Sequence, residues 1–298
     1  MKLNELSEKE EKIYMNLKNQ VDSFFKKTNE KSFKTRDRYR DAMHDFSKFL
    51  AQNYRKENLS AVNNKHISAY INHLQKVEGQ YSSSYVTTNL SAIRFFYDRK
   101  TKGKFIIKTN KELGVIPRTQ SDRIGSERSM KDKDLQTLYH AAKSINRLDY
   151  VKLFQVADTF GLRLHEAFKL RRSQIKKALK EGSIEIIGKG GLKRYLPLDP
   201  DGKQLLIELK NSKFTNSDRI FVENDKKTHL EMKTFQRFIN ISRKSGVTTS
   251  FHSLRHKYAN ELYHTLRSKG LTDFEARTVV SKRLGHNRLD ITNVYLHL

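Results

Sequence analysis

Four short segments of this 298-residue chain gather the arginines, lysines, histidines and tyrosines that could act on a phosphate ester. They read Phe-Gly-Leu-Arg-Leu-His-Glu at 160–166, Gly-Lys-Gly-Gly-Leu-Lys-Arg at 188–194, Phe-His-Ser-Leu-Arg-His-Lys at 251–257 and Leu-Gly-His-Asn-Arg at 284–288, the last followed by Tyr295. In a chain with 59 Lys and Arg, any one such residue is expected by chance as surface charge or as a phosphate contact. It is their combination that predicts a function.

These residue types suit the cleavage of a DNA strand by a protein oxygen. A phosphodiester is already anionic, so attack adds charge to its non-bridging oxygens, and guanidinium groups match those oxygens in a bidentate way. Two arginines can do the electrostatic work of a metal ion, which fits segments that lack a carboxylate cluster for Mg²⁺. A lysine can protonate the leaving 5′-oxygen. A tyrosine can form a phosphotyrosine of energy close to that of the DNA bond, so rejoining needs no ATP.

In their order along the chain, the four segments resemble the catalytic domain of the tyrosine recombinase (phage integrase) family, from about residue 129 to the end. The matching residues are Arg163 and Glu166 in Gly-Leu-Arg-x-x-Glu, Lys189 in Gly-Lys-Gly, His252, Arg255 and His256 in His-x-Leu-Arg-His, His286 in Leu-Gly-His, and Tyr295 nine residues later.

The resemblance implies a role for each matching residue. Arg163 and Arg255 hold the scissile phosphate, Lys189 is the general acid, His252 is an acid/base helper near the nucleophile, His286 hydrogen-bonds the phosphate, and Tyr295 attacks and stays attached to the 3′-phosphate. Glu166 is expected to brace the site rather than touch DNA. His256 is either another supporting residue or a structural histidine beside the core.

Neighbouring residues offer alternatives. Lys193 or Arg194 could replace Lys189 as the acid, since one predicted hairpin holds all three; the match to Gly-Lys-Gly favours Lys189. Other tyrosines, Tyr258 and Tyr263, lie in the interior of a predicted helix. We expect the remaining histidines of these regions, His165 and His264, to be bystanders.

Three residues follow Tyr295 in this sequence, whereas many family members have a longer tail that docks on a neighbouring subunit. A ring of subunits joined by exchanged tails is therefore not expected here. Either another contact orders the subunits, or the segment with the nucleophile is lent to the neighbour.

Positive charge is spread over both halves of the chain. The formal net charge is +26, with 24 basic and 13 acidic residues in 1–120 and 35 and 20 in 121–298. A polyanion that touches both halves suits this pattern better than a membrane surface or mere solubility, and nucleic acid is the usual polyanion.

The absence of Cys excludes a disulfide scaffold, a thiolate zinc site and a cysteine nucleophile. Without a signal-peptide core or an apolar run of roughly 18 residues, we expect a cytoplasmic protein.

Helical periodicity dominates the first third. Apolar residues recur at steps of three and four over 13–25, 39–50, 67–77 and 86–97, the last three sets after candidate caps at Thr35, Asn64 and the serines at 82–84. We expect residues 1–110 to form an all-α DNA-binding domain, the core-binding (SAM-like) domain that the family resemblance implies. Residues 111–128, with Gly114 and Pro117, are expected to be a linker.

Residues 129–298 are expected to form the catalytic domain, a mixed α/β but mainly helical domain with a small antiparallel sheet. Helices are predicted from a cap at Ser129, over 150–160, 233–244 and 253–266, and after a capping box of Thr272 and Glu275. The β-rich runs 183–188 and 194–198 predict a hairpin whose turn contains Lys189.

The sequence thus predicts a site-specific recombinase that cleaves and rejoins double-stranded DNA through a 3′-phosphotyrosyl intermediate, with strand exchange through a Holliday junction. We expect a tetramer assembled on two DNA sites, with no cofactor, metal, nucleotide or membrane partner. The alternatives are a type IB topoisomerase-like relaxing enzyme, a non-catalytic basic DNA-binding protein and a metal-dependent nuclease. Integration or excision of a mobile element, resolution and inversion all use the same chemistry.

Overall fold

A computed structural model describes residues 6–76, 81–119, 122, 124, 127–244, 246–286 and 288–297, and the side chain of Lys189 lies outside what it describes. The chain forms two compact units, residues 1–122 and 123–298. Each unit has a hydrophobic core of its own.

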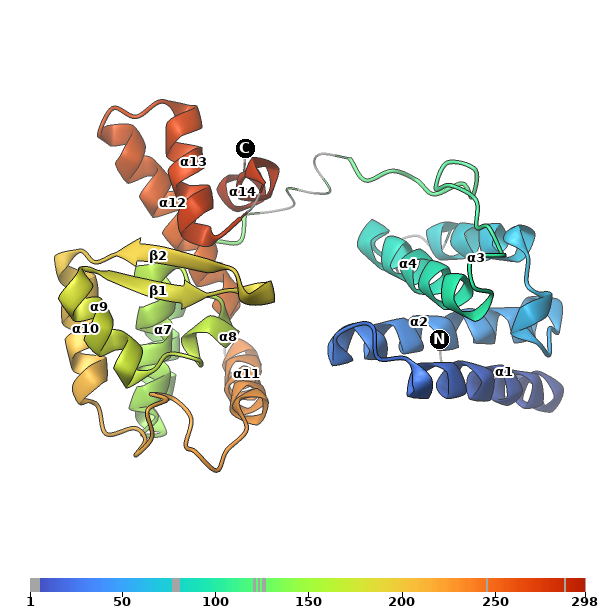
Figure 1. Ribbon diagram of the computed structural model, residues 1–298, viewed down its shortest axis with the longest axis horizontal. Coiled ribbons are helices and arrows are strands. Elements are labelled where there is room, and N and C mark those ends of the chain that lie inside the picture. The colour runs from blue at the N-terminus through green and yellow to red at the C-terminus, as the bar shows by residue number, and fades with distance from the viewer. Residues whose placement is uncertain are drawn as a thin grey trace. The chain divides into compact units, whose positions relative to one another are not determined.

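The first unit is all-α over its described residues (Figure 1). Its helices are α1 (Glu8–Lys27), α2 (Phe33–Tyr54), the short 3-10 helix η2 (Leu59–Ala61), α3 (Asn64–Lys76) and α4 (Ser83–Lys100). The apolar stripes read from the sequence form one core, in which Leu17, Phe46, Ile71 and Ile93 have no exposed surface. Val77, the last residue of the third stripe, lies outside the described residues.

The start of α2 differs from the prediction. Ser32, not Thr35, is the N-cap, and its hydroxyl accepts from the Thr35 amide at 3.3 Å. Thr35 is already in the first turn, where its own amide needs a partner. After α4 the chain stays packed on the same core, because Leu113 and Val115 are buried there.

The second unit is mainly helical with a two-stranded antiparallel sheet, which confirms the predicted fold class (Figure 1). In chain order its elements are α6 (Asp132–Ser144), α7 (Leu148–Phe160), α8 (Leu164–Ala167), α9 (Arg172–Glu181), β1 (Ser183–Ile187), η3 (Lys189–Gly191), β2 (Lys193–Pro197), α10 (Pro200–Asn211), α11 (Thr228–Lys244), α12 (Phe251–Ser268), α13 (Asp273–Leu284) and α14 (Leu289–Leu296). The cap predicted at Ser129 is wrong: Lys131 precedes α6, and the Ser129 hydroxyl instead accepts from Asn260 at 2.9 Å.

The core of this unit surrounds α7. Leu153, Phe154 and Ala157 have no exposed surface, and the Phe154 ring lies 5.2 Å from Phe235 of α11. A second, smaller cluster joins α12, α13 and α14, and it includes the side chain of Tyr295. The last helix is therefore held by few apolar contacts.

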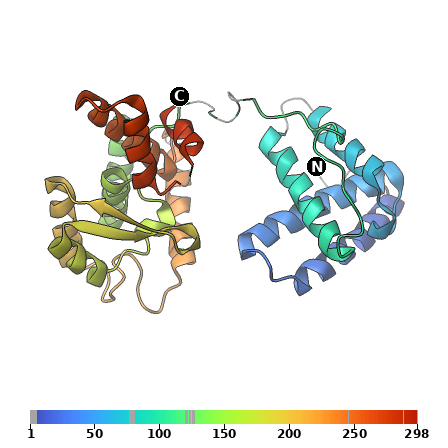
Figure 2. The ribbon, with the colours of Figure 1, turned by 45° about the horizontal axis from the view of Figure 1, so that its top comes forward.

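The hairpin pairs Ser183 with Pro197 and Ile187 with Lys193. Figure 1 and Figure 2 both show it running across the unit, with α9 against β1 and the end of α13 near β2. Side chains alternate along β2, so that Arg194 and Leu196 point inward while Lys193 and Tyr195 are exposed. The strand thus carries Arg194, the last residue of the second candidate segment, to the interior.

Candidate active site

Tyr295, in α14, lies among side chains from α12 and from the turn after α13. Its hydroxyl is 3.1 Å from Nε2 of His252, the second residue of α12. The His286 ring, just after α13, lies 4.9 Å from the Tyr295 ring, and the Arg255 guanidinium lies over that ring at 5.6 Å. Residues far apart in the sequence therefore meet around one hydroxyl.

Arg255 is completely buried. It donates to the carbonyl oxygens of Gly161, at 2.5 Å, and of Leu284, and one of its nitrogens lies 3.2 Å from Nε2 of His286. These bonds tie α12 to the ends of α7 and α13. Gly161 ends α7 in a left-handed conformation (φ 61°), where a Cβ would overlap the ring of Tyr258, so this position requires glycine.

A buried ion-pair network holds Arg163. Glu166 accepts from the Arg163 backbone at 2.9 Å and from its guanidinium at 3.0 Å. The same carboxylate accepts from Arg194 at 3.0 and 2.7 Å, one bond to each oxygen. Burial by itself would raise the pKa of Glu166, but the hydrogen bonds and charge of Arg194 prevail and lower it to about 2. Glu166 therefore stays ionised and fixes both arginines.

The histidines of the site are held neutral. Burial, and then the charges of Arg255 and Arg163, lower the pKa of His252 to about 4 and that of His286 to about 3. Burial and the nearby positive charge of Arg163 also lower the pKa of Arg255, to about 10, so its guanidinium remains charged at neutral pH. A neutral His252 Nε2 that faces the Tyr295 hydroxyl can accept its proton.

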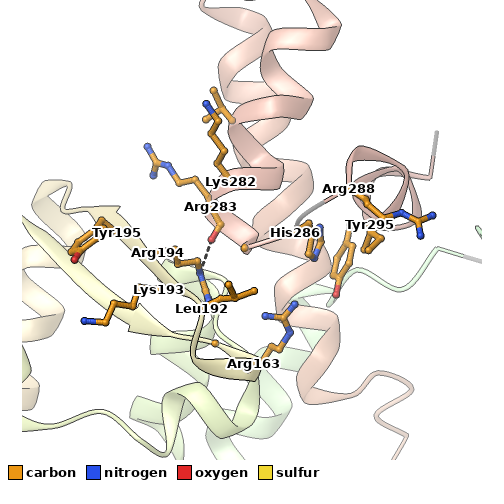
Figure 3. A pocket seen from close by; sticks show the side chains of 15 residues that line it. Arg163, Leu192, Lys193, Arg194, Tyr195, Lys282, Arg283, His286, Arg288 and Tyr295 are labelled. Atoms are coloured by element: carbon orange, nitrogen blue, oxygen red, sulfur yellow. Dashed lines mark hydrogen bonds between the residues drawn. The ribbon is translucent and has the colours of Figure 1, made fainter.

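Of these groups, Arg163, Arg194, His286 and Tyr295 line a cavity of about 1020 Å³ on the second unit. Figure 3 shows His286, Tyr295 and Arg288 on one side and Lys193 and Tyr195 on the other, with Arg163, Leu192 and Arg194 between them. Lys282 and Arg283 of α13 also line the cavity. The wall is thus basic and partly aromatic, a surface suited to a phosphate chain.

The hairpin turn brings three candidate acids near this cavity in different ways. Lys189 lies in η3, at the turn itself, but its side chain lies outside the described residues. Lys193 is exposed, pairs with Glu185 at 3.3 Å, and points away from His286 and Tyr295 (Figure 3). Arg194 is buried, with its donors directed at Glu166 and the Arg283 carbonyl. The geometry leaves neither Lys193 nor Arg194 directed at the nucleophile.

His256 packs flat against Tyr295, with ring centroids 4.4 Å apart and planes 26° from parallel. Burial and the neighbouring His252 and His297 lower its pKa to about 4. Asn260 also supports α14, because it donates to the Tyr295 carbonyl at 3.2 Å. His256 and Asn260 both come from α12, while His286, just after α13, contacts Thr292 of α14 at 3.1 Å.

The predicted bystanders lie elsewhere in α8 and α12. Tyr263 donates to Asp273 at 2.6 Å, and the Tyr258 ring packs against Gly161; neither is among the described residues that line the cavity. His165 is half-buried beside Glu166, and His264 is exposed. Reading the sequence did not anticipate the bracing by Asn260 and Arg194. A signal for Arg194 was present, since strand alternation places it on the same face as Leu196.

No helix in the described parts of the chain has the length and apolarity needed to cross a membrane. Nor do the described residues include a group of three or more His, Asp or Glu side chains placed to hold a metal ion.

The all-α first unit and the second unit with its Arg, His and Tyr cluster together define a tyrosine site-specific recombinase. The chain belongs to the phage integrase family, because the model of that family matches residues 128–298. A second model, described as the phage integrase N-terminal SAM-like domain, matches residues 17–105.

Curated relatives support the assignment over most of the chain. Tyrosine recombinase XerC of Pediococcus pentosaceus is 25% identical and shares 90% of this chain and 88% of its own length. Tyrosine recombinase XerD of Shewanella oneidensis is 24% identical over 87% of this chain and 84% of its own. The fold is similar to that of the XerH recombinase bound to a palindromic difH substrate (TM-score 0.65, 18% identity, 98% of this chain and 86% of that one). A lambda integrase dimer bound to a core site is similar too (TM-score 0.63, 19% identity, 93% and 94%).

Proposed function

We propose that the chain cleaves double-stranded DNA by attack of the Tyr295 hydroxyl on a backbone phosphate. The observation on which this proposal rests is the 3.1 Å contact between that hydroxyl and Nε2 of His252, in a cavity wall that also holds Arg163 and His286. The phenol proton passes to His252 as the bond between Tyr295 and phosphorus forms. The bond from phosphorus to the 5′-oxygen breaks, which leaves a 3′-phosphotyrosine and a free 5′-hydroxyl.

The arginines stabilise the charge that develops on phosphorus. Arg163 is half-buried at the cavity wall, and Arg255 has five N–H donors, of which the two carbonyls and His286 engage three. The remaining donors can bind the two non-bridging oxygens. His286 can donate to the phosphate from Nε2 once that nitrogen no longer accepts from Arg255, so this bond also requires the site to rearrange. Lys189, on the turn that faces this wall, is the general acid for the 5′-oxygen. Glu166 and His256 support the site without contacting DNA.

DNA binding must open the site. Arg255 has no exposed surface and Tyr295 is only 7% exposed, so a phosphate reaches them only if covering residues move. We propose that α14, which packs on the small apolar cluster of α12, α13 and α14, is the element that shifts.

The wider reaction is conservative exchange between two DNA sites. The 5′-hydroxyl of one cleaved strand attacks the phosphotyrosine of another, first to form a Holliday junction and then to resolve it. We propose a tetramer of this chain on two sites; a similar fold is found in a lambda integrase tetramer bound to a Holliday junction. Residues 1–110 are the helical DNA-binding domain, 111–128 the linker and 129–298 the catalytic domain. We propose that the protein acts in the cytoplasm.

A nicked suicide substrate tests the chemistry. The duplex carries the cognate site, found in DNA that flanks the gene, and cleavage releases a short fragment so that the adduct cannot religate. In EDTA we expect a covalent protein–DNA adduct on a denaturing gel with the wild type and with Tyr258→Phe, the matched control from the neighbouring helix, and none with Tyr295→Phe. No adduct on a site that the protein binds would support the non-catalytic alternative. Products exchanged between two sites separate a recombinase from a relaxing enzyme.

A further inference from the structure

Arg194 is a buried charge on a strand where a solvated side chain would be expected. It is 8% exposed and follows the exposed Lys193 by one residue, so its burial results from the alternation of β2. A buried guanidinium is tolerated only when its donors are satisfied. Its partners therefore indicate what the strand is attached to.

Those partners come from two other segments. Both Glu166 oxygens accept from Arg194, at 3.0 and 2.7 Å, and the Arg283 carbonyl at the end of α13 accepts from its Nε at 2.9 Å (Figure 3). Gly285, next to His286, leaves room for the side chain: a Cβ there would lie 3.1 Å from Arg194 Cδ. One side chain thus joins β2, α8 and the turn that precedes His286.

Arg194 also stands at the base of the turn that contains Lys189. It pairs with Ile186 across the hairpin, and the turn closes two residues further out, where the Gly188 amide donates to the Leu192 carbonyl at 2.7 Å. Gly188, the residue before Lys189, packs closely against the ion pair of Arg194 and Glu166, since a Cβ there would be 3.6 Å from each of these side chains. The Gly188 backbone, next to the proposed acid Lys189, is therefore positioned by the ion pair of Arg194 and Glu166.

We propose that Arg194 is a positioning residue for the general acid. It fixes the β1–β2 turn to the carboxylate that also holds Arg163, so that Lys189 and the phosphate-binding arginine are placed relative to each other. This inference rests on the proposed function, because it assumes that Lys189 protonates the leaving oxygen.

A lysine cannot replace this arginine. The planar guanidinium bonds both oxygens of Glu166 and the Arg283 carbonyl at once, whereas an ammonium group is a point donor on a flexible stem. Arg194→Lys keeps the charge beside Glu166, and with it the electrostatic balance of the site, but loses the fixed geometry. Glu166 retains its bonds to Arg163 in this variant, so the phosphate-binding side is perturbed least.

The leaving group distinguishes this role from a structural one. In a substrate with sulfur in place of the bridging 5′-oxygen, cleavage breaks the phosphorus–sulfur bond and releases a thiolate. A thiol has a pKa of about 8.5 and leaves without a proton, so a general acid is no longer needed. A variant that has lost only the placement of the acid should recover on this substrate.

The experiment compares single-turnover cleavage rates on the oxygen and sulfur substrates. We expect Arg194→Lys to be slower than the wild type by about 100-fold on oxygen, the lower end of what a general acid contributes, and within about threefold on sulfur. Lys189→Met is the reference and should show the same pattern. Arg172→Lys is the matched control, because Arg172 also anchors several segments, through the carbonyls of Leu209, Lys210, Thr215 and Ser217, and none of these partners belongs to the hairpin. Its two rates should change by the same factor.

The outcomes separate this inference from the proposed function. If Lys189→Met recovers on sulfur and Arg194→Lys does not, Arg194 does not act through the acid and the inference is overturned. An Arg194→Lys variant as fast as the wild type on oxygen overturns it as well. If Lys189→Met itself fails to recover on the sulfur substrate, the assignment of Lys189 as the general acid is wrong. If covalent adducts persist in Tyr295→Phe, the assignment of Tyr295 as the nucleophile is wrong.

Discussion

Replacing Glu166 by Gln removes the one carboxylate that Arg163 and Arg194 share. The resulting loss in the free energy of unfolding follows from how far the pKa of Glu166 is lowered in the folded chain. In the folded chain its pKa is about 2, against an ordinary 4.5, and each pH unit of such a difference is worth about 1.4 kcal/mol, so ionised Glu166 contributes about 3 kcal/mol to stability. Glu166 is 3% exposed, so solvent screening reduces this figure little. Breaking a buried ion pair has a similar cost, roughly 3–5 kcal/mol.

The sign of the pH dependence follows from the lowered pKa. A carboxylate that is more acidic when folded stabilises the chain fully above its unfolded pKa of 4.5, and that stability is lost as the pH falls towards 2. The wild type should lose about 2 kcal/mol from this group between pH 5 and pH 3, whereas Glu166→Gln should lose none of it. The difference in the free energy of unfolding between the wild type and Glu166→Gln should therefore decrease from about 3 kcal/mol at pH 7 to about 1 kcal/mol at pH 3.

Urea unfolding followed by circular dichroism measures this gap at each pH. Glu181→Gln is the control, because Glu181 forms an exposed pair with Lys177 at 3.7 Å, and such surface pairs contribute about 0–1 kcal/mol. A gap for Glu166→Gln below about 1 kcal/mol at pH 7, or one that stays constant down to pH 3, would refute the argument that this carboxylate is strongly paired.

Three further predictions concern the nucleophile and its surroundings. Gly161→Ala should destabilise the second unit by at least about 1 kcal/mol in urea unfolding, because a positive φ and the Tyr258 ring both oppose a Cβ; an unchanged midpoint would contradict this. His256→Ala should slow single-turnover cleavage about tenfold, since a ring pair is worth about 0.5–1.5 kcal/mol, with adduct formation still dependent on Tyr295. Cleavage at low DNA concentration, which reports the free protein, should show no histidine step between pH 5.5 and 8, because the pKa of His252 is about 4; a step near pH 6.5 would show that His252 is not held neutral.

Periodicity and turn chemistry predicted most of the fold. The apolar stripes of α1 to α4 extend over several turns, and the capping box of Thr272 and Glu275 forms as read because both members are present. The predicted caps at Thr35 and Ser129 were wrong for different reasons. Two hydroxyls, those of Ser32 and Thr35, stand near the start of α2, and the earlier one is the cap. The Ser129 hydroxyl is instead engaged in a tertiary contact, because it accepts from Asn260. The shortest helices, α8 and α14, have too few turns for a period to be read.

The candidate site could be predicted as a set of residues but not as a geometry. The order of the four segments points to Arg163, Arg255, His286 and Tyr295, and the fold brings these around one cavity. What the sequence does not reveal is burial: among 59 basic residues nothing marks Arg255 as fully enclosed or Arg194 as the anchor of the turn. Those facts depend on contacts between residues about 30 to 90 positions apart along the chain.

The most direct test of the central claim is to locate the covalent bond. The adduct trapped on the nicked substrate would be digested with trypsin and nuclease, and the nucleotide-bearing peptide sequenced by mass spectrometry. We predict a nucleotide joined through its 3′-phosphate to Tyr295, in the peptide that follows Arg288. A nucleotide on any other residue, or one joined through a 5′-phosphate, would contradict the account of the site given by His252, Arg255 and His286.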